Sequence, residues 1–178
     1  MITLKNSIKN ASHILKTSLI KSYLLDAEII LSNIMNVNRE FLLLNDELEI
    51  SNSIIKKYAK AIRKRSKKEP VAYIVGKKEF WSHNFLINKS TLIPRPETEL
   101  LVNEVINIYK DKSINILDIG TGSGCILLSI LKELNTSKGT GIDISKKAIL
   151  VAKNNAKKLK LLNRTCFKVR DINKFHSF

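Results

Sequence analysis

Apolar residues recur every three or four positions through the first third of the chain, which is the spacing of helices that bury one face. Thr3 is placed to cap the first of these helices. Further apolar positions predict a well-buried helix around 24–34 and an amphipathic helix around 54–62. The first helix would bury Leu4, Ile8, Ala11 and Leu15. We therefore expect a helical bundle that forms a domain over residues 1–68.

The period changes from helical to alternating at Glu69-Pro70. Residues 71–75 alternate in the manner of a strand, Gly76-Lys77 can turn, and apolar positions within 80–87 continue on a return strand. The pattern predicts a β-hairpin linker over residues 69–93.

Strands alternate with helices from residue 94 onward. Pro94 and Pro96 favour extended backbone followed by the first turn of a helix. The expected strands are 114–119, 139–144 and 165–169, and the helices between them are 125–134 and 145–160. This order indicates a parallel sheet. The fold class is therefore α/β, with a helical bundle and a hairpin followed by a partial, doubly wound, Rossmann-like sheet over residues 94–178.

The formal net charge of +15 invites a nucleic-acid interpretation, which we discount in part. Lysine supplies 25 of the 31 basic residues, and no aromatic-rich stacking surface accompanies it. We expect long-range attraction to an RNA-rich assembly but no direct nucleic-acid contact. No apolar run approaches the roughly 18 residues of a membrane helix, so a cytoplasmic protein without a membrane partner is expected. Cys125 and Cys166 have no neighbours that suggest a metal site or a disulfide.

A basic stretch over 63–68 allows two interpretations. It is a solvated face with cations near the end of a helix, or it is a contact with an acidic partner.

The segment 117–125, with the sequence Leu-Asp-Ile-Gly-Thr-Gly-Ser-Gly-Cys, is the strongest chemical signal. A buried strand leads into a three-glycine turn that opens a helix, and glycine allows both unusual dihedral angles and close approach of a ligand. Open α/β sheets bind ligands at this end of their strands. The glycine spacing is tighter than in the dinucleotide fingerprint, which favours a ligand without a pyrophosphate.

Two aspartates end the following strands. Asp143 lies 19 residues beyond Gly124, where its carboxylate can accept hydrogen bonds from a ribose diol. Asp171 follows the third strand, where it can reach an adenine amino group while Ile172 packs on the ring. The alternative for Asp171 is a loop residue that caps the next turn.

Together these residues resemble the class I S-adenosylmethionine-dependent methyltransferases. Two further segments, 69–81 and Ile93-Pro94-Arg95-Pro96-Glu97-Thr98-Glu99, are similar to the peptide-chain release factor glutamine methyltransferases, the PrmC/HemK family. A helical domain and a hairpin ahead of the methyltransferase fold are also similar, so the resemblance spans the whole chain. It implies that the first domain recognises the substrate.

The resemblance implies methyl transfer from S-adenosylmethionine to the glutamine side-chain amide in the Gly-Gly-Gln loop of release factors. By resemblance Asp143 takes the ribose hydroxyls, and Asp171 and Ile172 flank the adenine. The family often has tryptophan where Ile172 stands, so stacking is reduced to aliphatic packing. Arg95 and Glu97 either shape the cofactor pocket or form a salt-bridged helix start. The methionine and ribose region would be lined by Gly120, Thr121, Gly122, Ser123 and Gly124.

The family's substrate motif, Asn-Pro-Pro-Tyr, occurs nowhere in the 178 residues, so no catalytic residue is assigned. That motif is expected to hold the poorly nucleophilic amide in line with the methyl group, and such positioning is worth roughly 7–11 kcal/mol. We therefore expect a fragment of a longer enzyme that binds cofactor without reacting. Its strand 114–119 would have an unpaired edge, at which Ile114, Ile116 and Leu117 face a missing neighbour.

Two other functions stay open. One is an amino-methyltransferase that acts on adenine or cytosine in nucleic acid. The other is a non-catalytic S-adenosylmethionine-binding fragment.

Overall fold

The computed structural model describes residues 2–174, in which the helical bundle predicted for the N-terminal region is present. Side chains cap three of its helices: the Thr3 hydroxyl accepts from the Asn6 amide, Asn38 accepts from Phe41, and Ser51 accepts from Ile54. Apolar faces of α1, α2 and α4 meet in one core around Leu15, Leu31 and Ile62. The helices are α1 (Leu4–Thr17), α2 (Tyr23–Met35), α3 (Arg39–Leu44), α4 (Asn52–Ser66) and α5 (Val71–Val75).

The short helix α5 corrects the prediction of a strand over 71–75. The Pro70 carbonyl accepts hydrogen bonds from the Tyr73 and Ile74 amides, at 3.0 and 3.2 Å. Proline suits the start of a helix, and apolar side chains of α5 pack against the helical core. Tertiary packing thus outweighs the strand preference of this β-branched segment.

The hairpin exists, but it begins after Gly76. Strands β1 (Lys77–Phe80) and β2 (His83–Leu86) pair antiparallel, with Phe80 opposite His83. The two turn residues Trp81 and Ser82 have φ of 49° and 56°, and such left-handed pairs match the twist of hairpin strands. The chain divides by its internal contacts into two units, Met1–Val75 and Gly76–Phe178, so the hairpin is part of the second unit.

The second unit contains the predicted parallel sheet, in the strand order β3-β4-β5. Ile116 lies opposite Gly139, and Gly141 lies opposite Phe167. The elements are α6 (Thr98–Tyr109), β3 (Asn115–Ile119), α7 (Cys125–Glu133), β4 (Lys138–Asp143), α8 (Lys146–Lys158), the 3-10 turn η1 (Leu162–Arg164), β5 (Thr165–Val169) and the 3-10 turn η2 (Ile172–Lys174).

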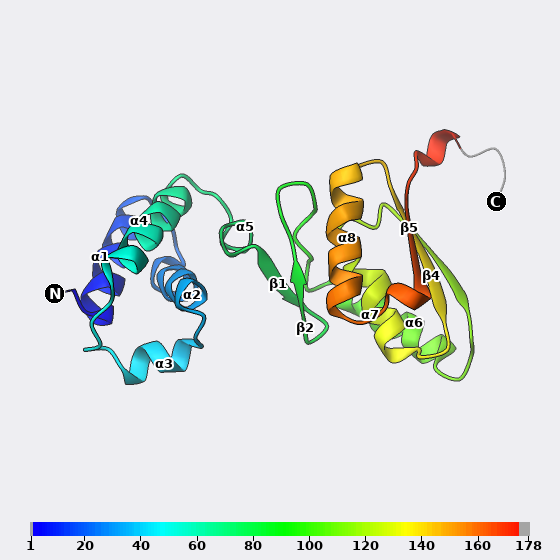
Figure 1. Ribbon diagram of the computed structural model, residues 1–178, viewed down its shortest axis with the longest axis horizontal. Helices are drawn as coiled ribbons and strands as arrows, with labels where there is room; N and C mark the ends of the chain where they lie inside the picture. The colour runs from blue at the N-terminus through cyan, green and yellow to red at the C-terminus, as the bar shows by residue number, and fades with distance from the viewer. Residues whose placement is uncertain (1, 175–178) are drawn as a thin grey trace. The chain divides into compact units, whose positions relative to one another are not determined.

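In the part of the chain that the structure describes, α7 and α8 cover the same face of this sheet (Figure 1). Gly139 permits the contact, because a Cβ there would lie 2.4 Å from the Leu127 side chain. On the other face Leu117 and Ile119 are 40% and 53% exposed. Strand β3 is an edge strand, as predicted, but only Leu117 of the three apolar residues named above is exposed. Ile114 and Ile116 pack against the core instead.

Among residues 2–174 there is no helix with the length and apolar content needed to cross a membrane.

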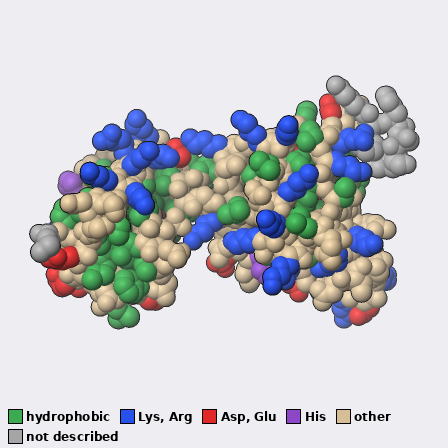
Figure 2. Space-filling model, in the orientation of Figure 1, with side chains coloured by type: hydrophobic (Ala, Val, Ile, Leu, Met, Phe, Trp, Pro, Cys, Tyr) green, Lys and Arg blue, Asp and Glu red, His purple; other side chains and the backbone are tan. Residues whose placement is uncertain are grey.

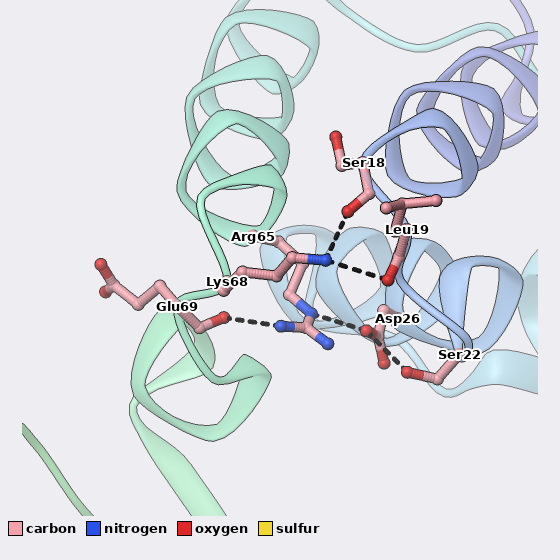
Figure 3. A network of polar contacts seen from close by, with 7 residues as sticks. All are labelled: Ser18, Leu19, Ser22, Asp26, Arg65, Lys68 and Glu69. Atoms are coloured by element: carbon pink, nitrogen blue, oxygen red, sulfur yellow. Dashed lines mark hydrogen bonds and ion pairs between the residues drawn. The ribbon is translucent and has the colours of Figure 1, made fainter.

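A network of polar contacts joins the end of α4 to α2 and to the end of α1 (Figure 3). Arg65 forms a 2.6 Å ion pair with Asp26, and both side chains are largely buried. The same guanidinium donates to the Glu69 carbonyl. The Lys68 ammonium donates to the Ser18 and Leu19 carbonyls beyond the end of α1. Part of the basic stretch 63–68 therefore has an internal structural role.

We predict that Arg65→Met lowers the free energy of unfolding of the first unit by roughly 3 kcal/mol, because it leaves the Asp26 carboxylate buried and unpaired. Far-UV circular dichroism during urea titration measures the change. Lys64→Met, which removes the same charge from an exposed neighbour, should change it by less than about 0.5 kcal/mol. Equal effects of the two variants would contradict a stabilising role for the buried Arg65–Asp26 ion pair.

Candidate functional site

The glycine loop connects β3 to α7 in the second unit. Gly120, Gly122 and Gly124 have φ of +75°, +55° and +78°, which only glycine adopts without strain. The Gly120 and Thr121 amides both donate to the Ile142 carbonyl at 2.9 Å. These bonds fasten the loop to the end of β4, because parallel pairing brings the carboxyl ends of β3 and β4 together.

Asp143 lies directly against this loop. Its Oδ2 accepts from the Gly122 amide at 3.0 Å, and its Oδ1 accepts from the Ser145 amide at 2.8 Å. The structure thus brings together the loop and the carboxylate that the sequence singled out separately. Each carboxylate oxygen can accept more than one hydrogen bond, so Asp143 keeps accepting capacity for a ligand.

The loop has open space on one side. A Cβ built on Gly120 would have no described atom within 4 Å, and one built on Gly122 would meet only the Gly120 carbonyl oxygen at 3.8 Å. A Cβ on Gly124 would instead lie 3.1 Å from the Leu128 side chain. The third glycine therefore serves helix packing, whereas the first two leave room for a ligand to approach the backbone.

Asp118, at the base of the loop, is a site feature that the sequence analysis did not single out. Its Oδ2 accepts from the Thr121 hydroxyl at 2.6 Å. Burial raises the pKa of Asp118, the nearby Asp143 charge raises it further, and the Thr121 hydrogen bond partly opposes this. Thr121 and Ser123 are buried as whole residues, so neither presents much surface at the loop.

The pKa of Cys125, at the start of α7, is raised chiefly by burial. A raised pKa keeps this thiol protonated and unreactive at neutral pH. Within residues 2–174 no three His, Cys, Asp or Glu side chains gather as potential metal ligands.

Asp171 follows the carboxyl end of β5, which lies beside the carboxyl end of β4 because the two strands are parallel. The neighbouring Arg170 amide donates to the Asp143 carbonyl at 3.0 Å. The Asp171 carboxylate accepts from the Asn173 amide at 3.0 Å, which is the turn-capping alternative considered above. Ile172 is 38% exposed. A contact of Asp171 and Ile172 with adenine stays a prediction.

In the segment 93–99 the structural role that we observe belongs to Glu99, although the sequence drew attention to Arg95 and Glu97. Glu99 accepts a 2.8 Å hydrogen bond from the Trp81 amide and so ties α6 to the hairpin turn. Arg95 and Glu97 are exposed, and no ion pair joins them within the described chain. The salt-bridged helix start is therefore not observed.

Asn155 on α8 links the hairpin to the glycine loop, which no sequence motif indicated. Its side-chain amide exchanges two hydrogen bonds with the backbone of Leu86, at 2.7 and 2.9 Å. The same amide nitrogen donates to the Ser123 carbonyl at 2.9 Å. Asn155 is 1% exposed, so one buried side chain holds two segments that are distant in sequence.

We predict that Asn155→Leu lowers the free energy of unfolding of the second unit by about 2–3 kcal/mol, because three backbone polar groups lose their partner. Urea unfolding followed by fluorescence of Trp81, the single tryptophan, measures the loss. Hydrogen exchange of the Leu86 amide should also accelerate. Asn154→Leu, at an exposed position of the same helix, is the matched control. An unchanged Leu86 exchange rate in Asn155→Leu would contradict the linking role.

Comparisons with known proteins match the two units separately. Residues 6–76 match the family described as PrmC N-terminal domain, and residues 110–178 match one described as methyltransferase domain. A Thiobacillus denitrificans SAM-dependent methyltransferase, crystallised with S-adenosyl-L-homocysteine, aligns with 47% of the chain and 32% of its own. That alignment has 26% sequence identity and a TM-score of 0.40.

Curated relatives match along nearly the whole chain. The release factor glutamine methyltransferase of Buchnera aphidicola subsp. Schizaphis graminum is 39% identical over 160 residues, which are 90% of this chain and 56% of the relative. That of Coxiella burnetii is 38% identical over 164 residues, covering 92% and 59%. A bifunctional methyltransferase of Rickettsia bellii is 39% identical over 79% of the chain and 30% of its own length. The chain thus spans less than two thirds of each of these relatives.

Proposed function

We propose that this chain, which joins a PrmC N-terminal domain to a methyltransferase domain and is homologous to release factor glutamine methyltransferases, supplies the cofactor-binding part of such an enzyme. The cofactor is S-adenosylmethionine. The substrate is the glutamine side-chain amide in the Gly-Gly-Gln loop of peptide-chain release factors. The observation that carries the proposal is the contact between the open glycine loop and the Asp143 carboxylate.

The residues of the site suit an adenosyl sulfonium. The free side of Gly120 and Gly122 admits a ligand to the backbone, and Asp143 can accept from ribose hydroxyls. The Asp143 carboxylate lies against the loop, and its negative charge favours a cationic sulfonium. Asp171 and Ile172 would flank the adenine.

S-adenosylmethionine supplies an activated methyl group when it is bound, so the protein has to position an acceptor. A glutamine amide is a poor nucleophile because its lone pair is delocalised into the carbonyl. The role of this chain is to hold the cofactor in a fixed orientation. Its loop can do so because four of its amides are already engaged within the protein, those of Gly120, Thr121, Gly122 and Gly124.

We predict that Asp143→Ala weakens S-adenosylmethionine binding by about 10–100-fold, because charge-assisted hydrogen bonds to the ribose are lost. Isothermal titration calorimetry measures the dissociation constant. Asp111→Ala, which removes the same charge from an exposed residue ahead of β3, is the matched control and should bind normally. Unchanged affinity in a folded Asp143→Ala variant would show that the cofactor site is misplaced.

Transfer of a labelled methyl group from S-adenosylmethionine tests the substrate assignment. Purified release factor and double-stranded DNA are offered separately to the chain, and the release factor is digested to locate the label. Label on the glutamine of the Gly-Gly-Gln loop would support the release-factor substrate. Label on DNA would favour the nucleic-acid amino-methyltransferase instead.

Cofactor binding without transfer to either acceptor would support the alternative of a non-catalytic cofactor-binding chain. The share of the relatives that the chain spans, 56% and 59%, is the observation that keeps this alternative open.

A further inference from the structure

A groove runs between α1 and α4 in the first unit. One hollow of about 330 Å³ is lined by Ile14 of α1 and by Ile62 and Arg63 of α4, among others. A second hollow of about 360 Å³ continues from it, and the two share Ile2 and Ile55. Both hollows lie within the first unit and are separate from the glycine loop.

Aliphatic side chains line much of the groove and are partly open, although polar residues also line it, among them Asn10 in the first hollow and the acidic Glu49 in the second. Ile2 and Ile14 are 42% and 47% exposed, although both lie where apolar side chains gather. Tyr58 beneath them is 4% exposed, and its hydroxyl donates to the Ala27 carbonyl at 2.9 Å. The groove therefore offers aliphatic contacts and no exposed aromatic ring from Tyr58 on which a base could stack.

The two helices that line the groove have one sign of charge. Residues 4–17 and 52–66 contain nine lysines and arginines and no aspartate or glutamate. Figure 2 shows lysine and arginine side chains gathered over α4 on the face in view. Two of the nine, Lys5 and Arg65, have acidic partners, and the others form no ion pair among residues 2–174.

Three basic residues that form no ion pair within residues 2–174 lie at helical spacing along α4 beside the groove. Lys56, Lys60 and Arg63 are at positions i, i+4 and i+7 of α4, so they share one side of the helix. Arg63 itself lines the groove, which places this row along its border. Lys64 lies only about 40° round α4 from Lys60, so it belongs to the same side of the helix, whereas the exposed Lys9 lies about 100° or more round α1 from each α1 residue that lines the groove.

We propose that this groove binds an acidic amphipathic helix of a partner protein. Apolar side chains of the partner at i, i+3 and i+7 would fill the groove between α1 and α4, in the manner of helix-in-groove recognition. Acidic side chains on one flank would face Lys56, Lys60 and Arg63, so charge complementarity sets the orientation of the bound helix. This inference goes beyond the proposed methyl transfer and does not depend on the cofactor site.

The test uses the 178-residue chain and a fluorescein-labelled helical peptide of about 18 residues, long enough to form a helix. The peptide carries leucine at i, i+3 and i+7, glutamate on the adjoining flank, and alanine elsewhere. A second peptide has glutamine in place of each glutamate. Fluorescence anisotropy should show saturable binding of the glutamate peptide and at least about tenfold weaker binding of the glutamine peptide.

Variants of the chain locate the contact. Ile14→Glu and Arg63→Glu should each weaken binding about tenfold or more, since each removes a contact inside the groove. Lys9→Glu makes the same kind of charge reversal on the side of α1 away from the groove and should leave the affinity within about twofold. All three positions are partly or fully exposed, and circular dichroism checks that the variants remain folded.

Three outcomes would overturn the proposal. One is equal loss of affinity in Lys9→Glu and Arg63→Glu, which would indicate unspecific attraction. Another is normal binding by a folded Ile14→Glu variant. The third is displacement of the peptide by a 20-nucleotide single-stranded RNA whose own binding is lost in the same variants. None of these outcomes bears on S-adenosylmethionine affinity, so failure here is distinguishable from failure of the proposed function.

Discussion

The hydrogen bond from the Gly122 amide to the Asp143 carboxylate is the contact on which the functional site depends. It joins a loop after β3 to the last residue of β4, so it forms only if the two strands are parallel and in register. The positive φ of Gly122 is compatible with glycine and strained for other residues. The same carboxylate also accepts from the Ser145 amide ahead of α8. Loop, strand end and helix start are therefore organised around one side chain.

The buried Asn155 and the half-buried Glu99 hold the surroundings of this site in place. Asn155 joins β2 to the glycine loop, and Glu99 joins α6 to the hairpin turn. Polar groups inside a protein are costly unless they are paired, and these are paired with backbone groups of distant segments. The hairpin is thus part of the frame of the second unit, not only a connection between units.

The two units differ in architecture and in the kind of binding surface that each contains. The first is a helical core with an Arg65–Asp26 ion pair at one end and an open, basic-bordered groove between α1 and α4. The second is a parallel sheet with one covered face in the described part of the chain and a loop suited to a small cationic ligand. Recognition of a protein partner in the first unit and cofactor binding in the second would be consistent with a methyltransferase that acts on a protein.

Much of this organisation follows from the sequence alone. Helical and alternating apolar periods predicted the bundle and the parallel strands, and the residue type at the start of the first helix predicted the Thr3 cap, because these depend on local spacing and backbone chemistry. The glycine spacing and the position of Asp143 led us to predict a ligand site, which stays a prediction, and the structure shows the loop in contact with that carboxylate. The glycine motif is local in sequence, whereas its contact with Asp143 depends on the parallel pairing of β3 and β4.

Only the tertiary structure decided the rest. Residues 71–75 alternate like a strand yet form α5, because Pro70 starts a helix whose apolar side chains reach the bundle core. Asn155 and Asp118 acquire their roles from partners that lie elsewhere in the chain or in the fold. The groove likewise exists only where α1 and α4 meet. A sequence pattern reports the preferences of residues that are close together in the chain. These features arise instead from contacts between segments that folding brings together.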